Sequence, residues 1–226
     1  MRILHVADLH FNQAWFAWVS EQTEHYEAIV IAGDLLDMFD YAKTKLSDQI
    51  NWVTRWIDSQ RGPLLIVSGN HDFYSGDGLG NEQLSAARWL KTHARSRAVW
   101  VDGGTAEIHG VKFGLCSWGW QYDDWPSAAD VVIVHAPPSF AAVSADGGRD
   151  VGDPEVRDAI LEHTPRWVLS GHVHEPRRWW TLIESTLCLN PGCDPTAPIP
   201  NFIVVDTHKN TASWHVYGEH PDIITA

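Results

Sequence analysis

The stretch Ala28-Ile29-Val30-Ile31-Ala32-Gly33-Asp34 joins a continuous apolar run to a Gly-Asp pair that follows it directly. A short run that is apolar at every position is typical of a strand buried on both faces of a sheet. The glycine permits a tight turn, which leaves the aspartate at the carboxyl end of the strand. The same order, an apolar run followed by polar residues, recurs along the chain.

Strands and helices alternate in the first half of the chain. Apolar residues at helical spacing, such as Leu46, Ile50, Val53 and Ile57, separate the apolar runs. This βαβαβ pattern implies parallel strands with helical crossovers. The predicted strands are residues 2–7, Ala28–Ala32 and Leu64–Val67, and the predicted helices are Ala14 to His25, residues 44–60 and Gln83–Ala94.

The second half is mostly β-structure. One helix, at about residues 154–163, interrupts it, with Asp153 as its N-cap and Pro154 in its first turn. We expect loops 74–81 and 144–152 to be mobile surface loops, and we find no linker, so residues 1–226 are predicted to form a single domain. The predicted strands are Ala98–Val101, Ala106–His109, Val111–Cys116, Val131–Val134, Trp167–Leu169, Trp179–Ile183, Thr186–Leu189, Phe202–Val205 and Ser213–Val216.

The composition limits the class of protein and its partners. The 226 residues are 44% hydrophobic, which is enough for a sizeable core, and no stretch approaches the length of a membrane span. The formal net charge of −13 disfavours extended contact with nucleic acid. Arg2–Ala7 resembles a buried strand rather than a signal peptide, so we expect a cytoplasmic protein without a membrane partner. The three cysteines, Cys116, Cys188 and Cys193, are expected to be reduced packing residues.

Polar residues suited to binding metal follow five of the predicted strands. In open α/β sheets, the carboxyl ends of parallel strands lie along one edge, where ligands bind. Residues spread over more than 160 positions would therefore converge on one site. The segments are Asp8-Leu9-His10, Gly33-Asp34, Gly69-Asn70-His71-Asp72, His135 and Gly171-His172-Val173-His174, and Asn190-Pro191-Gly192 is a further polar segment after an apolar run.

This ordered set resembles the calcineurin-like metallophosphoesterase superfamily of dinuclear metal phosphohydrolases. The resemblance spans residues 8 to 174, and Asn190-Pro191-Gly192 matches a frequent later element of the family. It implies an α/β fold in which two mixed β-sheets form a sandwich flanked by helices (αββα). The site is then expected at one edge of the sandwich.

The resemblance also implies the roles of the site residues. Asp8, His10 and His174 would bind one metal, Asn70, His135 and His172 would bind the other, and Asp34 would bridge the two. A carboxylate can span two cations about 3.5–4 Å apart. Mixed oxygen and imidazole ligands favour two divalent ions, Mn²⁺ first, with Fe, Zn²⁺ or Ni²⁺ as alternatives.

The implied reaction is hydrolysis of a small phosphodiester or phosphomonoester by a metal-bound hydroxide, with a diester, such as a nucleotide, favoured. His71 would assist the leaving group, and Asp72 would orient its imidazole. One alternative is a nuclease acting on nucleic-acid ends, which the acidic charge disfavours. Another is a non-catalytic protein-binding scaffold, which the retention of His71 disfavours.

Several further residues have two readings. Asn12 caps the next helix or reaches the site, with the cap favoured, and Asp37 supports the ligands or orders its loop. The tryptophan-rich loop 117–126 stacks on substrate or anchors itself. One of Arg177 and Arg178 is a candidate phosphate clamp, or both lie on a strand surface. Loop 136–152 is either a cover for the site or a disordered segment.

Overall fold

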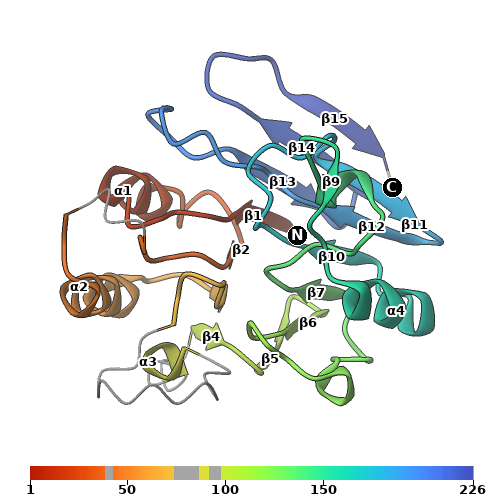
Figure 1. Cartoon of the computed structure of the whole chain (residues 1–226), viewed down its shortest axis with the longest axis horizontal. Coiled ribbons are helices and arrows are strands. Elements are labelled where there is room, and N and C mark those ends of the chain that lie inside the picture. Colours follow the sequence, from red (N-terminus) through yellow and green to blue (C-terminus); the bar gives the residue numbers. More distant parts are fainter. Residues whose placement is uncertain (39–42, 74–86, 92–97, 226) are drawn as a thin grey trace.

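The protein forms two large β-sheets packed face to face, with helices on both outer surfaces (Figure 1). The computed structural model describes residues 1–38, 43–73, 87–91 and 98–225. This is the predicted sandwich of two mixed sheets flanked by helices, so the predicted fold class is confirmed.

The seven-stranded sheet contains the parallel strands that the first half of the sequence predicts. Each of the first three strands is buried along almost its whole length, which explains their apolar runs. The strands, in spatial order, are β15 (Asp222–Thr225), β14 (Thr211–His215), β13 (Phe202–Asp206), β1 (Arg2–Val6), β2 (Ala28–Ala32), β3 (Leu64–Val67) and β4 (Val99–Val101). β1 to β4 are parallel, and β13 pairs antiparallel with β1.

The edge strand β15 is absent from the sequence prediction. It pairs antiparallel with β14 but is mostly exposed, with Ile223 at 66% exposure. A strand that buries so little apolar surface has no strong hydrophobic pattern, so its pairing partner determines its structure.

The six-stranded sheet comes entirely from the middle of the chain. Its strands, in spatial order, are β11 (Trp180–Ile183), β12 (Thr186–Leu189), β10 (Trp167–Leu169), β7 (Val131–Ile133), β6 (Val111–Leu115) and β5 (Thr105–Ile108). Its central strands β12, β10, β7 and β6 are parallel, and the two outer strands pair antiparallel with them. Both sheets are therefore mixed, and each has parallel strands at its centre.

Three apolar clusters hold these layers together. The first lies between the sheets and contains Ile3 and Val30 of the seven-stranded sheet together with Phe113 and Leu169 of the six-stranded sheet. The second lies between the seven-stranded sheet and helices α1 (Gln13–Glu21) and α2 (Leu46–Ser59), and the third lies under α4 (Pro154–His163). In Figure 1, α1 and α2 accordingly lie on the opposite side of the sheets from α4.

The helix boundaries follow their capping residues. The side chain of Asn12 accepts hydrogen bonds from the backbone N–H groups of Ala14 and Trp15, so its predicted role as a cap is confirmed. Asp153 caps α4 in the same way. α1 ends at Glu21, four residues before the predicted end at His25. Of the predicted helix Gln83–Ala94, the structure describes α3 (Arg88–Lys91), and most of the remainder lies outside the described residues.

The segment after His135 is more regular than the sequence predicts. Residues 144–152, expected to be a mobile loop, contain a small hairpin of β8 (Ala145–Asp146) and β9 (Arg149–Asp150). Ser144 Oγ donates a hydrogen bond to Asp150 Oδ1 at 2.6 Å, which closes the hairpin. The other predicted mobile loop, 74–81, lies outside the described residues. Within the described ranges, no helix has the length and apolar character needed to cross a membrane.

Candidate metal centre

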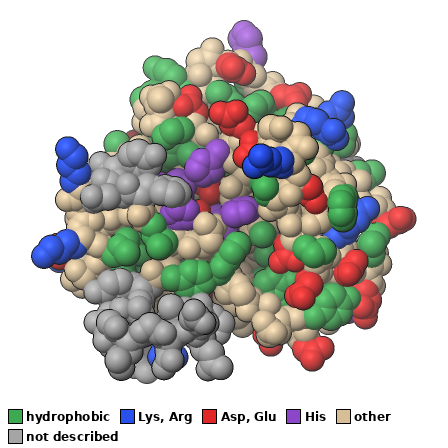
Figure 2. All heavy atoms as spheres, viewed as in Figure 1, with side chains coloured by type: hydrophobic (Ala, Val, Ile, Leu, Met, Phe, Trp, Pro, Cys, Tyr) green, Lys and Arg blue, Asp and Glu red, His purple; other side chains and the backbone are tan. Residues whose placement is uncertain are grey.

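The predicted ligands converge at one edge of the sandwich, where strands of both sheets end. Asp8, Asp34 and Asn70 follow β1, β2 and β3 of the seven-stranded sheet. His135 follows β7 of the other sheet, and His172 and His174 follow β10. Figure 2 shows histidine side chains gathered around a hollow in the middle of one face, with acidic side chains among them.

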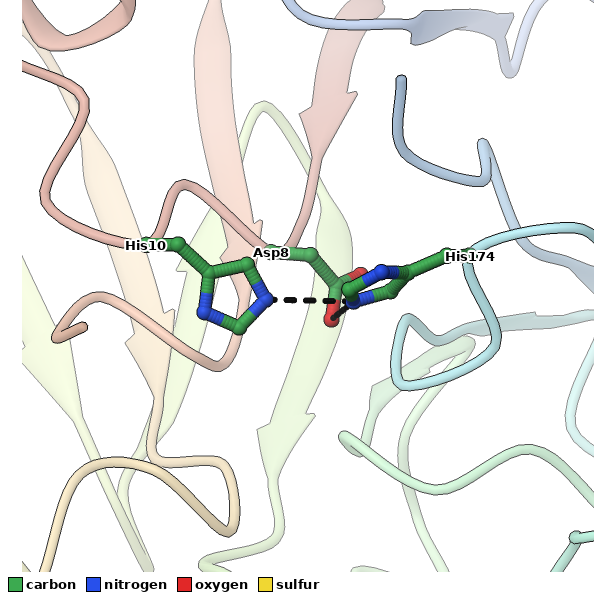
Figure 3. A group of neighbouring side chains, drawn as sticks. All are labelled: Asp8, His10 and His174. Carbon is green, nitrogen blue, oxygen red and sulfur yellow. Dashed lines mark hydrogen bonds and ion pairs between the residues drawn. The ribbon is translucent and has the colours of Figure 1, made fainter. Parts of the chain in front are cut away.

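Asp8, His10 and His174 form the first group, and they point toward one another (Figure 3). The Nε2 atoms of His10 and His174 are 3.1 Å apart, and His174 Nε2 lies 3.7 Å from Asp8 Oδ1. The backbone N–H of His172 donates to both carboxylate oxygens of the buried Asp8, at 3.1 and 3.2 Å, and so fixes its orientation. Two imidazoles and one carboxylate are a donor set that suits a divalent cation.

Asn70, His135 and His172 form the second group. Asn70 Oδ1 lies 2.9 Å from His172 Nδ1 and 3.0 Å from His135 Nε2. The other ring nitrogen of His135, Nδ1, lies 2.7 Å from the carbonyl oxygen of Ala32. A carbonyl oxygen only accepts, so Nδ1 carries the proton, and Nε2 is the nitrogen that faces the centre.

Asp34 lies between the two groups. Its Oδ2 atom is 3.3 Å from His135 Nε2 and 4.0 Å from His10 Nε2, and the side chain is 2% exposed. Burial alone would raise the pKa of this carboxyl group, but the surrounding imidazoles, His135 above all, hold it well below its usual range. Burial likewise lowers the pKa of His135, and the facing carboxylate outweighs it and raises that pKa to about 9. A cation that binds here therefore displaces a proton.

The backbone around the ligands adopts an uncommon conformation. Asp8, His10, Asp34 and His172 have φ angles of 54°, 40°, 53° and 68°, in the left-handed region that non-glycine residues rarely adopt. Such conformations cluster at functional sites because the surrounding structure holds them there. They turn the chain sharply at the strand ends, which directs consecutive ligands into the same small volume.

Two motif glycines provide the space for the carboxylates. A Cβ atom at Gly69 would collide with the carboxylate of Asp34, and one at Gly171 would lie 2.7 Å from Asp8 Oδ2. Real Cβ atoms do not approach other atoms as closely as either of these two contacts would require. Glycine is therefore needed at both positions because a carboxylate lies directly against the backbone, and it also allows the chain to turn there.

His71 lies beside the centre on the Asp34 side. Its Nε2 atom is 3.9 Å from Asp34 Oδ2, and its backbone N–H donates to Asp34 Oδ1 at 2.9 Å. Burial lowers the pKa of the His71 imidazole, and the nearby Asp34 carboxylate offsets this only in part. The potential ligand atoms of His10, Asp34 and His71 also lie within 4.8 Å of one another, so position alone allows His71 either to bind a cation or to act on the substrate.

Asp72 is fully buried and makes its described hydrogen bonds to backbone. Oδ1 accepts from the N–H groups of Leu35 and Leu36 at 2.9 and 3.0 Å, and Oδ2 accepts from Gly69 at 2.8 Å. Its carboxylate thus connects the loop of Asp34 to the loop of Asn70. Burial, supplemented by the charge of Asp34, raises the pKa of Asp72 to about 8.

Asn190 supports the site, although the sequence assigned it no role. Its buried amide nitrogen donates to the carbonyl oxygens of Gly171, Val173 and Val143, and its Oδ1 accepts from Gly192. These bonds hold the loop that carries His172 and His174. Asn190 directly follows the apolar strand β12, which is the signal by which the ligands themselves were found.

Asp102 is a second supporting residue, and the sequence analysis missed it. It follows β4, and its carboxylate accepts from the N–H and the Oγ of Ser68, both at 2.7 Å. Ser68 Oγ in turn accepts from the backbone N–H of Trp118 at 3.1 Å. Asp102 thereby connects the loop of Asn70 to the tryptophan-rich loop. A polar residue after an apolar run was again the available signal.

The remaining candidates divide between the site and the core. In loop 117–126, the ring of Trp118 lies beside the rings of His135 and His172, with centroids 5.6 Å apart in both cases. Trp120 and Trp125 are instead buried and packed against each other.

Other candidates lie near the site without forming part of the ligand groups. Arg177 and Arg178 line a cavity beside His174. Asp37 is buried, and its backbone is held by hydrogen bonds with the side chain of Gln49. The three cysteines are free and buried, as expected.

Comparison with known proteins agrees with this geometry. The family model described as calcineurin-like phosphoesterase matches residues 1–176. No curated protein sequence matches the chain. A dimetal phosphatase from Danio rerio is similar in structure, with a TM-score of 0.65 and 12% identity over 100% of this chain and 98% of that one.

Two further solved structures cover almost the whole chain. A protein of Thermus thermophilus has a TM-score of 0.61 and 14% identity, covering 99% of this chain and 98% of that one. An archaeal phosphodiesterase has a TM-score of 0.53 and 19% identity, covering 99% of this chain and 100% of that one. At these sequence identities, the similarity to solved structures establishes only the fold. The match to the family model establishes that the chain is a member of the family. The chain belongs to the calcineurin-like phosphoesterase family.

Proposed function

We propose that the protein is a dinuclear metal phosphodiesterase that hydrolyses a small phosphate ester. The observation that carries this proposal is the position of Asp34, whose Oδ2 atom faces His135 on one side and His10 on the other. A buried carboxylate between two imidazole groups suits a bridging ligand of two cations. In this proposal, Asp8, His10 and His174 bind one cation and Asn70, His135 and His172 the other.

The donor set fits divalent ions that accept both oxygen and nitrogen. No thiolate is among the ligands, which disfavours a closed structural zinc site, and we propose Mn²⁺ as the native ion. Two such cations, when bound, would provide the activation of water and the stabilisation of charge that hydrolysis of a phosphate ester needs.

His71 is proposed to act on the leaving group. Its ring lies beside His10, with centroids 4.9 Å apart, and its Nε2 atom is 3.9 Å from Asp34 Oδ2. From there, the imidazole can donate a proton to the departing oxygen. Asp72 contributes by position, because it fixes the loops on both sides of His71.

The charge of the site favours a diester. The eight converging residues (Asp8, His10, Asp34, Asn70, His71, His135, His172 and His174) include no lysine or arginine. A phosphodiester carries one negative charge and a monoester up to two, so a diester needs less compensation. The archaeal phosphodiesterase and the fish phosphatase share the fold, so the fold itself allows both reactions. We also propose that residues 1–226 act as one domain, since β13 beyond the family match pairs with β1.

The test is hydrolysis of bis(4-nitrophenyl) phosphate and 4-nitrophenyl phosphate by protein loaded with Mn²⁺. We expect a higher kcat/KM for the diester, loss of activity with a chelator, and recovery when Mn²⁺ is restored. Elemental analysis should find about two ions per chain. A protein that binds metal yet hydrolyses neither ester would instead be a non-catalytic scaffold. Preference for DNA ends, with strong salt dependence, would favour the nuclease alternative.

A further inference from the structure

The cavity beside His174 adjoins the candidate metal centre. Its volume is about 490 Å³, which is within the range of small-molecule sites. His174 lines it, and the same residue approaches Asp8 and His10 in the first ligand group. A molecule with a phosphate at the metal centre can therefore extend its neighbouring group into this cavity.

One wall of the cavity contains a tryptophan held in a fixed plane. The indole ring of Trp214 stacks on the buried Trp179, with centroids 6.2 Å apart and an interplanar angle of 14°. Its Nε1 atom donates to the carbonyl oxygen of Pro191 at 2.8 Å. These contacts fix the orientation of the ring before a ligand binds, which reduces the entropy lost on binding.

The cavity also contains an amide with unused hydrogen-bonding capacity. Asn201 lines the cavity and is 8% exposed, yet its Oδ1 atom is buried and has no hydrogen-bond partner among the described residues. Leaving such a group unpaired is costly, so a buried amide of this kind requires an explanation. A ligand that offers both a donor and an acceptor would satisfy it, since the amide can present either atom after rotation.

Charged side chains of both signs lie beside these groups. Arg177 and Arg178 line the same cavity, together with Glu175, Asp194 and Glu219. The backbone N–H of Arg177 donates to the carbonyl oxygen of Ala145, at 3.0 Å, so the hairpin β8–β9 helps to fix its position. A guanidinium group can pair with a phosphate oxygen of the ligand through its N–H donors.

We propose that this cavity is a subsite for the base of a nucleotide-type substrate. A nucleobase has a flat face for the aromatic wall and an edge with donors and acceptors for Asn201, as asparagine pairs with adenine. The inference rests on the proposed function, because it places the phosphate at the metal centre.

Binding of AMP and ribose 5-phosphate tests the subsite, because these ligands differ only in the base. Calorimetry on the full chain in the His71→Ala background, with and without Mn²⁺, measures affinity without depending on turnover. We expect AMP to bind about tenfold more tightly, which corresponds to about 1.4 kcal/mol. Asn201→Leu and Trp214→Leu should each bring the two affinities close together, whereas Asn51→Leu, on the exposed surface of α2, should preserve the difference.

Equal affinity for the two ligands, or a difference that both cavity variants preserve, would overturn the subsite. Trp214→Phe provides a check on folding, because it keeps an aromatic face and should retain part of the preference for AMP. The proposed function is tested separately by the nitrophenyl esters. A protein that hydrolyses them but does not distinguish AMP from ribose 5-phosphate has the activity without the subsite.

Discussion

His135 Nε2 lies 3.3 Å from Asp34 Oδ2, although the two residues follow strands of different sheets. The other ring nitrogen of His135, Nδ1, donates a hydrogen bond to the carbonyl oxygen of Ala32 in β2, so the ring contacts the seven-stranded sheet twice. The candidate metal centre therefore spans the junction of the two sheets. Its geometry depends on how the sandwich packs as well as on the loops that carry the ligands.

Replacing Asp34 by asparagine is expected to remove bound metal. Asparagine has a similar shape, but it lacks the negative charge of Asp34, whose Oδ2 atom faces both ligand groups. Elemental analysis of purified protein measures the loss. Asp123→Asn, at an exposed position, is the matched control. Unchanged metal content in Asp34→Asn would exclude the bridging role.

Substitution of His71 by alanine separates catalysis from metal binding. If His71 acts on the leaving group, turnover should fall by roughly 10² or more, because general acid catalysis contributes at least that much. Metal content should stay at the level of the unaltered protein. Loss of metal together with activity would show that His71 is a ligand, as its position near His10 and Asp34 also allows.

A methyl group at Gly69 should disrupt the centre through steric conflict. The Cβ of Gly69→Ala would collide with the Asp34 carboxylate, so either the carboxylate or the loop has to move. We expect weaker metal binding and a loss of about 1–3 kcal/mol in the free energy of unfolding. Gly62→Ala is the control, since its nearest new contact would be an ordinary 3.5 Å. Equal metal affinity in both variants would show that the Asp34 loop adapts without difficulty.

Asn190→Leu is expected to lower both stability and metal affinity. The change leaves the carbonyl oxygens of Val173 and Val143 without their described donor, and it removes one of the two donors to the carbonyl oxygen of Gly171. Because an unsatisfied buried group costs about 1–3 kcal/mol, we expect a loss of about 3 kcal/mol or more, measured by urea unfolding. Asn51→Leu, on the exposed face of α2, is the control. Full metal affinity with only a loss of stability would limit Asn190 to a structural role.

The buried side chain of His5 should make the stability of the folded protein depend on pH. It is fully buried, and by the alternation of β1 it lies on the same face as Ile3, between the sheets. Burial lowers the pKa of His5 from 6.5 to about 3. Between these values, the unfolded chain binds the proton and the folded chain does not, so stability falls as the pH drops through this interval.

The measurement compares urea unfolding of the natural protein and His5→Leu at pH 7 and pH 5. Lowering the pH should cost the natural protein about 2 kcal/mol more than the variant, because leucine cannot take up a proton. The comparison cancels the contribution of every other titrating group. An equal loss in both proteins would show that His5 is protonated without penalty in the folded state.

Residues near the ligands show where prediction from sequence stops. Asp8, Asp34 and Asn70 were found because each follows a run buried on both faces, and Asn12 and Asp153 were found because helix caps are local. Asp102 and Asn190 follow apolar runs in the same way. Nothing in the sequence states that their side chains would hold the loops of other strands, because those contacts join distant segments.

The sequence by itself determined the parallel strands, the two capped helices and the identity of the converging polar residues. These features depend on periodicity and on neighbours within a few positions. Only the tertiary structure decided that Asp34 faces histidines on both sides, that His71 lies beside Asp34, and that Asn201 and Trp214 share a cavity with His174. Each of these depends on the packing of two sheets whose strands are far apart in the chain, and local propensity contains no information about that distance.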